Sequence, residues 1–113
     1  DTPETVKPGV KPECGGPEAS AAMKRLAPAG ARVKLIRDRT QDDRDRYGRI
    51  LRTLVVDGRD VALQLVRSGL ADVYIFAGNP SRRVPTYQRA QAQARSRSRG
   101  VFGDCNGDFH SLQ

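Results

Sequence analysis

Residues 50–69, ILRTLVVDGRDVALQLVRSG, combine a strand, a tight turn and a capped helix in one continuous run. The apolar and β-branched residues 50–56 predict a strand, and Asp57-Gly58 directly after them is a tight-turn signal. Asp60 is suited to cap the helix that follows, and Gly69 supplies its C-terminal stop. This strand–turn–helix unit predicts a mixed α+β domain.

Upstream of this unit, a Gly-Pro-Glu sequence at 16–18 favours a helix start, because proline suits the first turn and the glutamate faces the positive end of the helix dipole. We expect this helix to end before Pro28. Alternating apolar and charged residues over 31–37 predict a half-buried strand. Residues 38–47 mix dense charges of both signs, which predicts a solvated turn region.

Downstream of the unit, residues 70–76 predict a short extended stretch, and residues 85–100 predict the last helix. Val101 and Phe102 are expected to fold back onto the core. Residues 106–113 are expected to form a loose tail, in which His110, the only histidine of the chain, has no evident partner.

The composition bounds the class of protein. A chain of 113 residues with 37% hydrophobic residues forms one small domain or part of one. No apolar run approaches the roughly 20 residues that a membrane helix needs, so we expect no membrane span. The net charge of +7 favours polyanionic partners, and nucleic acid above all; anionic membrane surfaces and simple solubility are the alternatives.

Cys14 and Cys105 are the only two cysteines and lie near opposite ends of the chain. In a small domain such a pair indicates one disulfide that closes a long loop, and hence an exported protein. Two buried free thiols are the alternative.

Two short motifs carry candidate chemistry. Residues 1–5, DTPET, place two carboxylates and two hydroxyls in one loop, an oxygen-rich set of the kind that Ca²⁺ selects. Residues 47–49, YGR, add a guanidinium. A carboxylate loop with a guanidinium suits metal-assisted phosphodiester hydrolysis, because it offers a base for the water and a charge clamp for the phosphate. Solvated surface charges are the alternative for both motifs.

Five segments stand out in order along the chain: DTPET at 1–5, GPEAS at 16–20, YGR at 47–49, the run over 57–71 and AQAQA at 90–94. Together they resemble the staphylococcal nuclease, or thermonuclease, family. The resemblance reaches from residue 1 to about residue 102 and implies a five-stranded OB-type barrel with three α-helices. It further implies a Ca²⁺-dependent endonuclease that hydrolyses DNA and RNA to 3′-phosphates.

The resemblance implies roles for residues of both motifs. Asp1 corresponds to a carboxylate ligand of Ca²⁺, and Thr2 to a residue that gives its backbone carbonyl to the ion. Glu4 matches the carboxylate assigned as general base for the attacking water. Arg49 matches an arginine that stabilises the pentacoordinate phosphate and the leaving oxygen.

The resemblance also implies a nucleotide pocket with Tyr47 and Tyr74 at its walls. The cysteines depart from the type member of the family. Their aligned positions, before the first helix and after the last, support a bridge between Cys14 and Cys105.

In this family three strands precede the DTPET motif and carry another calcium aspartate and a second phosphate-clamping arginine. The resemblance therefore implies that residues 1–103 are the C-terminal part of a nuclease domain with an incomplete barrel, followed by a tail at 104–113, and that this chain is an impaired enzyme. We expect a secreted or cell-envelope monomer that prefers single-stranded DNA and RNA. The alternatives are a nucleic-acid-binding module without catalysis and an inactive fragment.

Overall fold

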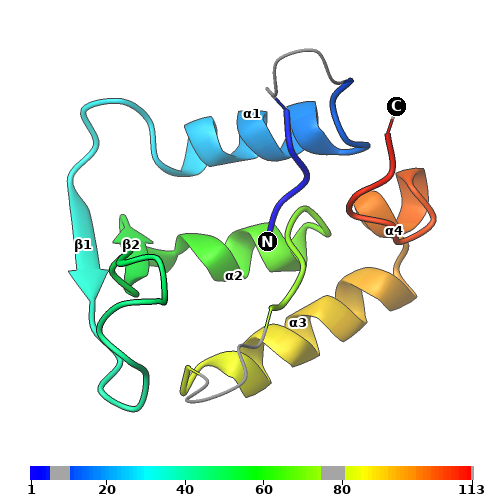
Figure 1. Ribbon diagram of the computed structural model, residues 1–113. Coiled ribbons are helices and arrows are strands. Elements are labelled where there is room, and N and C mark those ends of the chain that lie inside the picture. The colour runs from blue at the N-terminus through cyan, green and yellow to red at the C-terminus, as the bar shows by residue number, and fades with distance from the viewer. Residues whose placement is uncertain (6–10, 75–80, 113) are drawn as a thin grey trace.

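The strand, tight turn and helix predicted over residues 50–69 are present, with the strands at one side of the molecule and the helix in its middle (Figure 1). The computed structural model describes residues 1–5, 11–74 and 81–112. Within these residues, three longer helices and one further short helix accompany three strands. The elements are α1 (Gly16–Leu26), β1 (Val33–Ile36), β2 (Thr53–Val56), β3 (Arg59–Asp60), α2 (Val61–Arg67), α3 (Val84–Ser96) and α4 (Val101–Asp104).

The sheet is antiparallel with the order β1-β2-β3, and Val33 of β1 lies opposite Val56 of β2. Asp57 and Gly58 build the predicted tight turn between β2 and β3, with φ angles of 51° and 73°. The strand predicted over residues 50–56 begins only at Thr53. The α+β class is confirmed, with a three-stranded open sheet among the described residues.

Asp60 caps α2 as predicted and also ties this helix to α3. Its Oδ1 accepts a hydrogen bond from the backbone N–H of Leu63 at 3.1 Å. Its Oδ2 accepts from the Tyr87 hydroxyl at 2.7 Å and from Nη1 of Arg83 at 3.2 Å. Asp60 is only 8% exposed, so these partners compensate a carboxylate that is removed from water.

The main core lies around α2, which runs between α1 and α3 (Figure 1). The neighbouring helices present alanines, and these small side chains allow the helices to approach α2 closely. The buried residues of this core are Ala19, Ala22, Val56, Val61, Leu65, Val66, Leu70, Ala71 and Ala90.

The C-terminal part of the chain differs from the expectation. The last long helix ends at Ser96, and the chain turns before α4 begins at Val101, whose N–H bonds to the carbonyl oxygen of Gly69 at 2.9 Å. Val101 is fully buried, so the predicted return to the core is confirmed. The expectation of a loose tail is wrong, because Phe109 is 5% exposed and packs in a second core with Val101 and Cys105.

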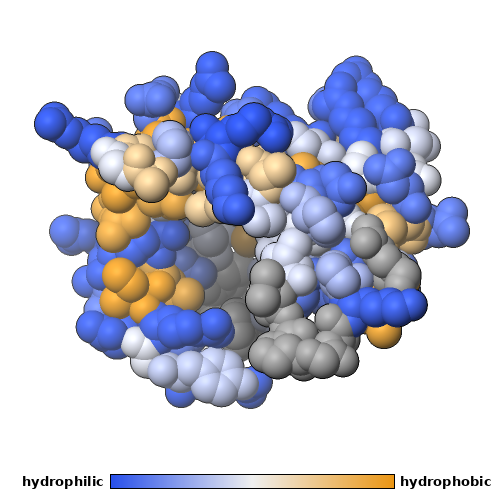
Figure 2. Space-filling view, turned by 90° about the horizontal axis from the view of Figure 1, so that it is seen from above, coloured by the Kyte–Doolittle hydropathy of each residue, from blue (hydrophilic) through white to orange (hydrophobic). Residues whose placement is uncertain are grey.

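Figure 2 shows one face on which hydrophilic residues dominate and hydrophobic residues appear as separate patches. None of the helices in the described ranges combines the length and apolar character needed to cross a membrane.

Candidate active site

The start of the chain lies against the segment that follows α2. The nitrogen of Asp1 donates to the carbonyl oxygen of Asp72 at 2.8 Å, and the N–H of Asp72 donates back to Asp1 at 2.6 Å. Gln91 of α3 holds the same segment, donating to the Asp72 carboxylate at 2.6 Å and accepting from the N–H of Val73 at 3.1 Å. Residues 70–74 form no strand, and residues 75–76 of the predicted extended stretch lie outside the described residues.

The backbone of Glu4 is held at both of its polar groups by one residue. Its N–H donates to Oε2 of Glu13 at 2.7 Å, and its carbonyl oxygen accepts from the N–H of Glu13 at 2.9 Å. The first turn of α1 also approaches closely, since a Cβ at Gly16 would collide with the carbonyl oxygen of Glu4. Glu4 itself is exposed, so a fixed backbone presents a solvent-accessible carboxylate.

The YGR motif forms a turn organised by Asp45. Oδ1 of Asp45 accepts from the backbone N–H groups of Tyr47 and Arg49, both at 2.9 Å. Oδ2 accepts from Nε of Arg49 at 2.7 Å, and the guanidinium lies 5.3 Å from the centre of the Tyr47 ring. The Arg49 side chain is 70% exposed, so its outer N–H groups are left to face solvent or a ligand.

Asp45 overturns part of the expectation for residues 38–47. Its side chain is only 4% exposed, so it does not belong to a fully solvated turn. Burial by itself raises the pKa of Asp45, but the hydrogen bonds from Arg49 and Tyr47 outweigh burial and lower this pKa below its usual value. The carboxylate is therefore ionised at neutral pH and keeps its hold on Arg49.

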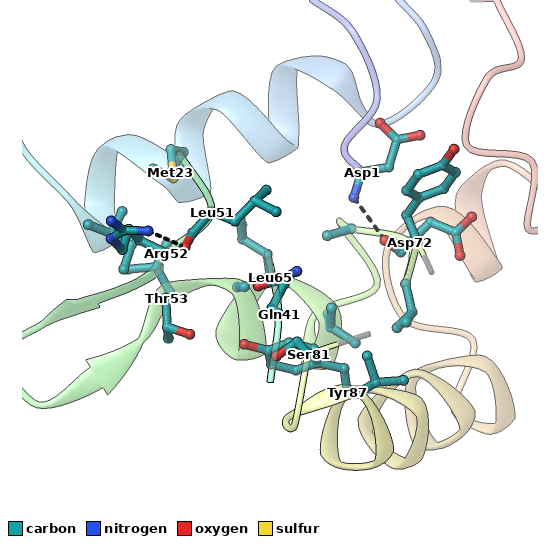
Figure 3. Close-up of a pocket in the computed structure, with 18 residues that line it drawn as sticks. Asp1, Met23, Gln41, Leu51, Arg52, Thr53, Leu65, Asp72, Ser81 and Tyr87 are labelled. Atoms are coloured by element: carbon teal, nitrogen blue, oxygen red, sulfur yellow. Dashed lines mark hydrogen bonds between the residues drawn. The ribbon is translucent and has the colours of Figure 1, made fainter. Parts of the chain in front are cut away.

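Asp1 and Tyr74 line a common groove of about 400 Å³ together with Leu51 and Arg52. Asp1 lies at one end of this groove and Arg52 at the other (Figure 3). Much of the wall between them is apolar, and Tyr74 is 65% exposed. Within the parts of the chain that the structure describes, no hydrogen bond or ion pair joins Arg49 to residues 1–5.

Residues 1–5 offer ligands of the chemical kind that Ca²⁺ prefers, but too few of them. Asp1 supplies a carboxylate and Thr2 a carbonyl, whereas Ca²⁺ takes about 6–8 oxygen ligands. Over residues 1–5, 11–74 and 81–112 there is no group of three or more His, Cys, Asp or Glu side chains placed to hold a metal ion. The missing ligands would have to come from water, a substrate or other residues.

Comparison with known proteins decides the family. The family described as "Staphylococcal nuclease homologue" matches residues 1–104, which include both motifs and the helices around them. The chain belongs to the staphylococcal nuclease homologue family.

Two Bacillus subtilis (strain 168) relatives of this staphylococcal nuclease homologue are endonucleases by name. The SPbeta prophage-derived endonuclease YokF is 34% identical over 103 residues, covering 90% of this chain and 34% of the relative. Endonuclease YncB is 41% identical over 80 residues, covering 70% of this chain and 37% of the relative. The chain thus spans about a third of the length of the curated relatives that it matches.

The structure places four further residues at the candidate site of this staphylococcal nuclease homologue. Asp45 lies four residues before Arg49, but the two pair across a turn and not along a helix, so their spacing alone does not predict the contact. Gln91 belongs to the AQAQA segment, but its partners at 72 and 73 are remote in sequence. Glu13 and His110 carry no local signal, because their partners become neighbours only in the fold.

Proposed function

We propose that this staphylococcal nuclease homologue is a Ca²⁺-dependent endonuclease that hydrolyses DNA and RNA to 3′-phosphate products. The observation that carries the proposal is the Asp45-held guanidinium of Arg49, which is fixed on one side and exposed on the other. Because this guanidinium is already held in place, it can contact a phosphate at little further cost in conformational entropy. The endonuclease names of both relatives support the same reaction class.

In the proposed reaction Glu4 takes a proton from a water molecule, and the oxygen of that water attacks phosphorus. The bond from phosphorus to the 5′ oxygen breaks, and this oxygen gains a proton, so the products are a 3′-phosphate and a 5′-hydroxyl. Arg49 donates hydrogen bonds to the charge that develops on the phosphoryl oxygens. Ca²⁺, held in part by Asp1 and Thr2, supplies positive charge near the phosphate when it is bound.

Tyr47 and Tyr74 are proposed to contact the nucleotide. Both rings are 65% exposed, and exposed aromatic rings offer stacking surfaces for unpaired bases, which supports a preference for single strands. Residues 1–103 are proposed as the C-terminal part of an OB-type barrel domain, followed by residues 104–113. The three-stranded open sheet and the groove beside it support this assignment. Cys14 and Cys105 form the disulfide expected from the sequence, which supports export, and a monomer is the proposed state.

Nucleic-acid binding without catalysis is the second candidate function. Two observations favour it: the net charge of +7, and the absence, in the described parts of the chain, of a hydrogen bond or ion pair between Arg49 and residues 1–5. Basic surfaces bind phosphate backbones whether or not a catalytic centre is complete.

The test is cleavage of single-stranded DNA with Ca²⁺ or with chelator. Glu4→Gln and Arg49→Lys are each expected to lower the cleavage rate by roughly 10²–10³-fold. Glu18→Gln is the matched control, because Glu18 is an exposed carboxylate in the first turn of α1. Chelator-sensitive cleavage that is lost in Glu4→Gln and kept in Glu18→Gln supports the enzyme. DNA retention without cleavage, unchanged by Glu4→Gln, supports the binding module.

A further inference from the structure

The segment that includes residues 105–112 is fastened to the loop that leads into α1. Cys105 forms a disulfide with Cys14, and the N–H of Cys14 donates to the carbonyl oxygen of Ser111 at 2.6 Å. Leu112 pairs with Glu13 in an antiparallel bridge. Figure 1 shows this C-terminal segment beside the loop before α1. The disulfide, the bridge and the buried ring of Phe109 therefore fix the segment at several points.

His110 extends from this segment to the carboxylate loop. Its Nε2 lies 3.1 Å from Oδ2 of Asp1. Its Nδ1 lies 3.3 Å from both carboxylate oxygens of Glu13. The backbone N–H of His110 donates to Oδ1 of Asp108 at 2.9 Å, which holds the main chain at this position. One imidazole ring thus bridges two carboxylates that lie 12 positions apart in the sequence.

Glu13 connects His110 to Glu4. Its carboxylate accepts a hydrogen bond from the Glu4 N–H and also faces the His110 ring, and the Glu13 side chain is only 16% exposed. The backbone N–H of Glu13 donates to Glu4 as well. His110 therefore contacts Asp1 directly and reaches Glu4 through Glu13. Asp1 and Glu4 are the two acidic residues of the DTPET motif.

We propose that His110 is a positioning residue that orients Asp1 directly, and Glu4 through Glu13, for phosphodiester hydrolysis. The proposal rests on the proposed function, because it assigns a purpose to the orientation of these two carboxylates. Exposed ion pairs add little to global stability, and the His110 side chain is 59% exposed, so removal of the ring is expected to loosen the loop more than the fold. Outer-shell partners that orient ligating or catalytic side chains commonly affect activity in this way.

Three substitutions separate the two contacts of the ring. His110→Ala removes both. His110→Gln places an amide nitrogen near the position of Nε2 and keeps the Asp1 contact, whereas His110→Asn places one near Nδ1 and keeps the Glu13 contact. Leu112→Ala is the control, because Leu112 lies in the same segment, is 60% exposed and pairs with Glu13 only through the backbone bridge, which the substitution leaves in place.

The first readout is amide hydrogen exchange in residues 1–5 and 11–13 of the full chain without metal. His110→Ala is expected to accelerate exchange at Glu4 roughly threefold to tenfold, the range that corresponds to one lost hydrogen bond. Leu112→Ala is expected to match the wild type. If residues 1–5 exchange at the same rate in His110→Ala as in the wild type, the proposal is overturned. Circular dichroism checks that each variant is folded.

The second readout is cleavage of single-stranded DNA, with kcat and KM measured separately. His110→Ala is expected to lower kcat roughly tenfold to hundredfold with KM within about twofold, and His110→Gln or His110→Asn is expected to recover part of kcat. An equal loss in Leu112→Ala, or no recovery by either amide, overturns the proposal. If the wild type cleaves no DNA, the proposed function fails, and the exchange comparison still decides whether His110 orders the loop.

Discussion

Replacing Cys14 and Cys105 together with alanine removes the covalent link between the loop before α1 and the C-terminal segment. These residues are separated by 91 positions, so the bond closes most of the chain into one loop. Without the bond, the unfolded chain can adopt many more conformations. The conformation of the folded state is nearly the same with or without the bond. The double variant is therefore expected to unfold more easily, mainly because its unfolded state is more favourable.

The size of the effect follows from the length of the loop. For a separation of 91 residues, the chain-entropy relation gives about 15.5 cal/mol/K, or about 4.6 kcal/mol at 25 °C. Small domains have total unfolding free energies of about 5–15 kcal/mol, so this loss is a large share of the stability. A chain of this size is expected to lose roughly 20 °C in Tm.

The assay is urea unfolding followed by far-UV circular dichroism, because the chain has no tryptophan. Wild-type protein with its disulfide reduced is the control, since it keeps both sulfur atoms and loses only the bond. It is expected to unfold at nearly the same urea concentration as the double alanine variant. A loss below about 1 kcal/mol, in a wild type whose disulfide is verified by thiol counting, would refute the reasoning. It would mean that the unfolded chain already keeps its ends together.

Three further outcomes are expected. Burial and the hydrogen bond to Asp60 raise the pKa of Tyr87, so this bond stabilises the fold fully below the unfolded tyrosine pKa of about 10 and loses its contribution as the pH rises further. Tyr87→Phe is expected to cost about 1–2 kcal/mol in urea unfolding at neutral pH, and a difference from the wild type that does not narrow above pH 10 contradicts this. Gly69→Ala places a Cβ against a backbone carbonyl of the turn before α4 and is expected to lower the unfolding free energy by more than about 1 kcal/mol. Gly58→Ala is the control, because Gly58 has a similar φ but open space around it. Equal losses of unfolding free energy in the two variants would contradict the predicted collision at Gly69. Asp45→Asn keeps an acceptor for the turn but removes the charge opposite the YGR guanidinium, so DNA cleavage is expected to fall roughly a hundredfold. Tm is expected to fall only by the contribution of the ionised carboxylate, and full activity would show that this pairing does not matter.

The same carboxylate is expected to make the unfolding free energy depend on pH in the acidic range. The pKa of Asp45 is lowered in the folded state, so its ionised form stabilises the turn above the unfolded aspartate pKa of about 3.9. This contribution is lost as the pH falls below that value. The same loss is expected to be absent in Asp45→Asn.

Much of the candidate site could be predicted from the sequence, but not how its parts are held. DTPET and YGR identify the residues with the required chemistry, because a carboxylate loop and a guanidinium are visible as residue types. The roles of Glu13 and His110 could not be predicted, because neither residue type nor spacing connects them to Glu4 or Asp1. The groove that Asp1 shares with Tyr74 likewise exists only where segments far apart in the sequence meet.

The sequence by itself determined α1, the turn at 57–58, the Asp60 cap of α2 and the α+β class. These features depend on proline, glycine, capping side chains and apolar spacing, which act within a few residues of one another. Only the tertiary structure decided that the C-terminal segment is packed, that Glu13 bonds to the backbone of Glu4 and that His110 contacts Asp1. The physical reason is that burial and ion pairing depend on which distant surfaces come together, and no local pattern encodes that neighbourhood.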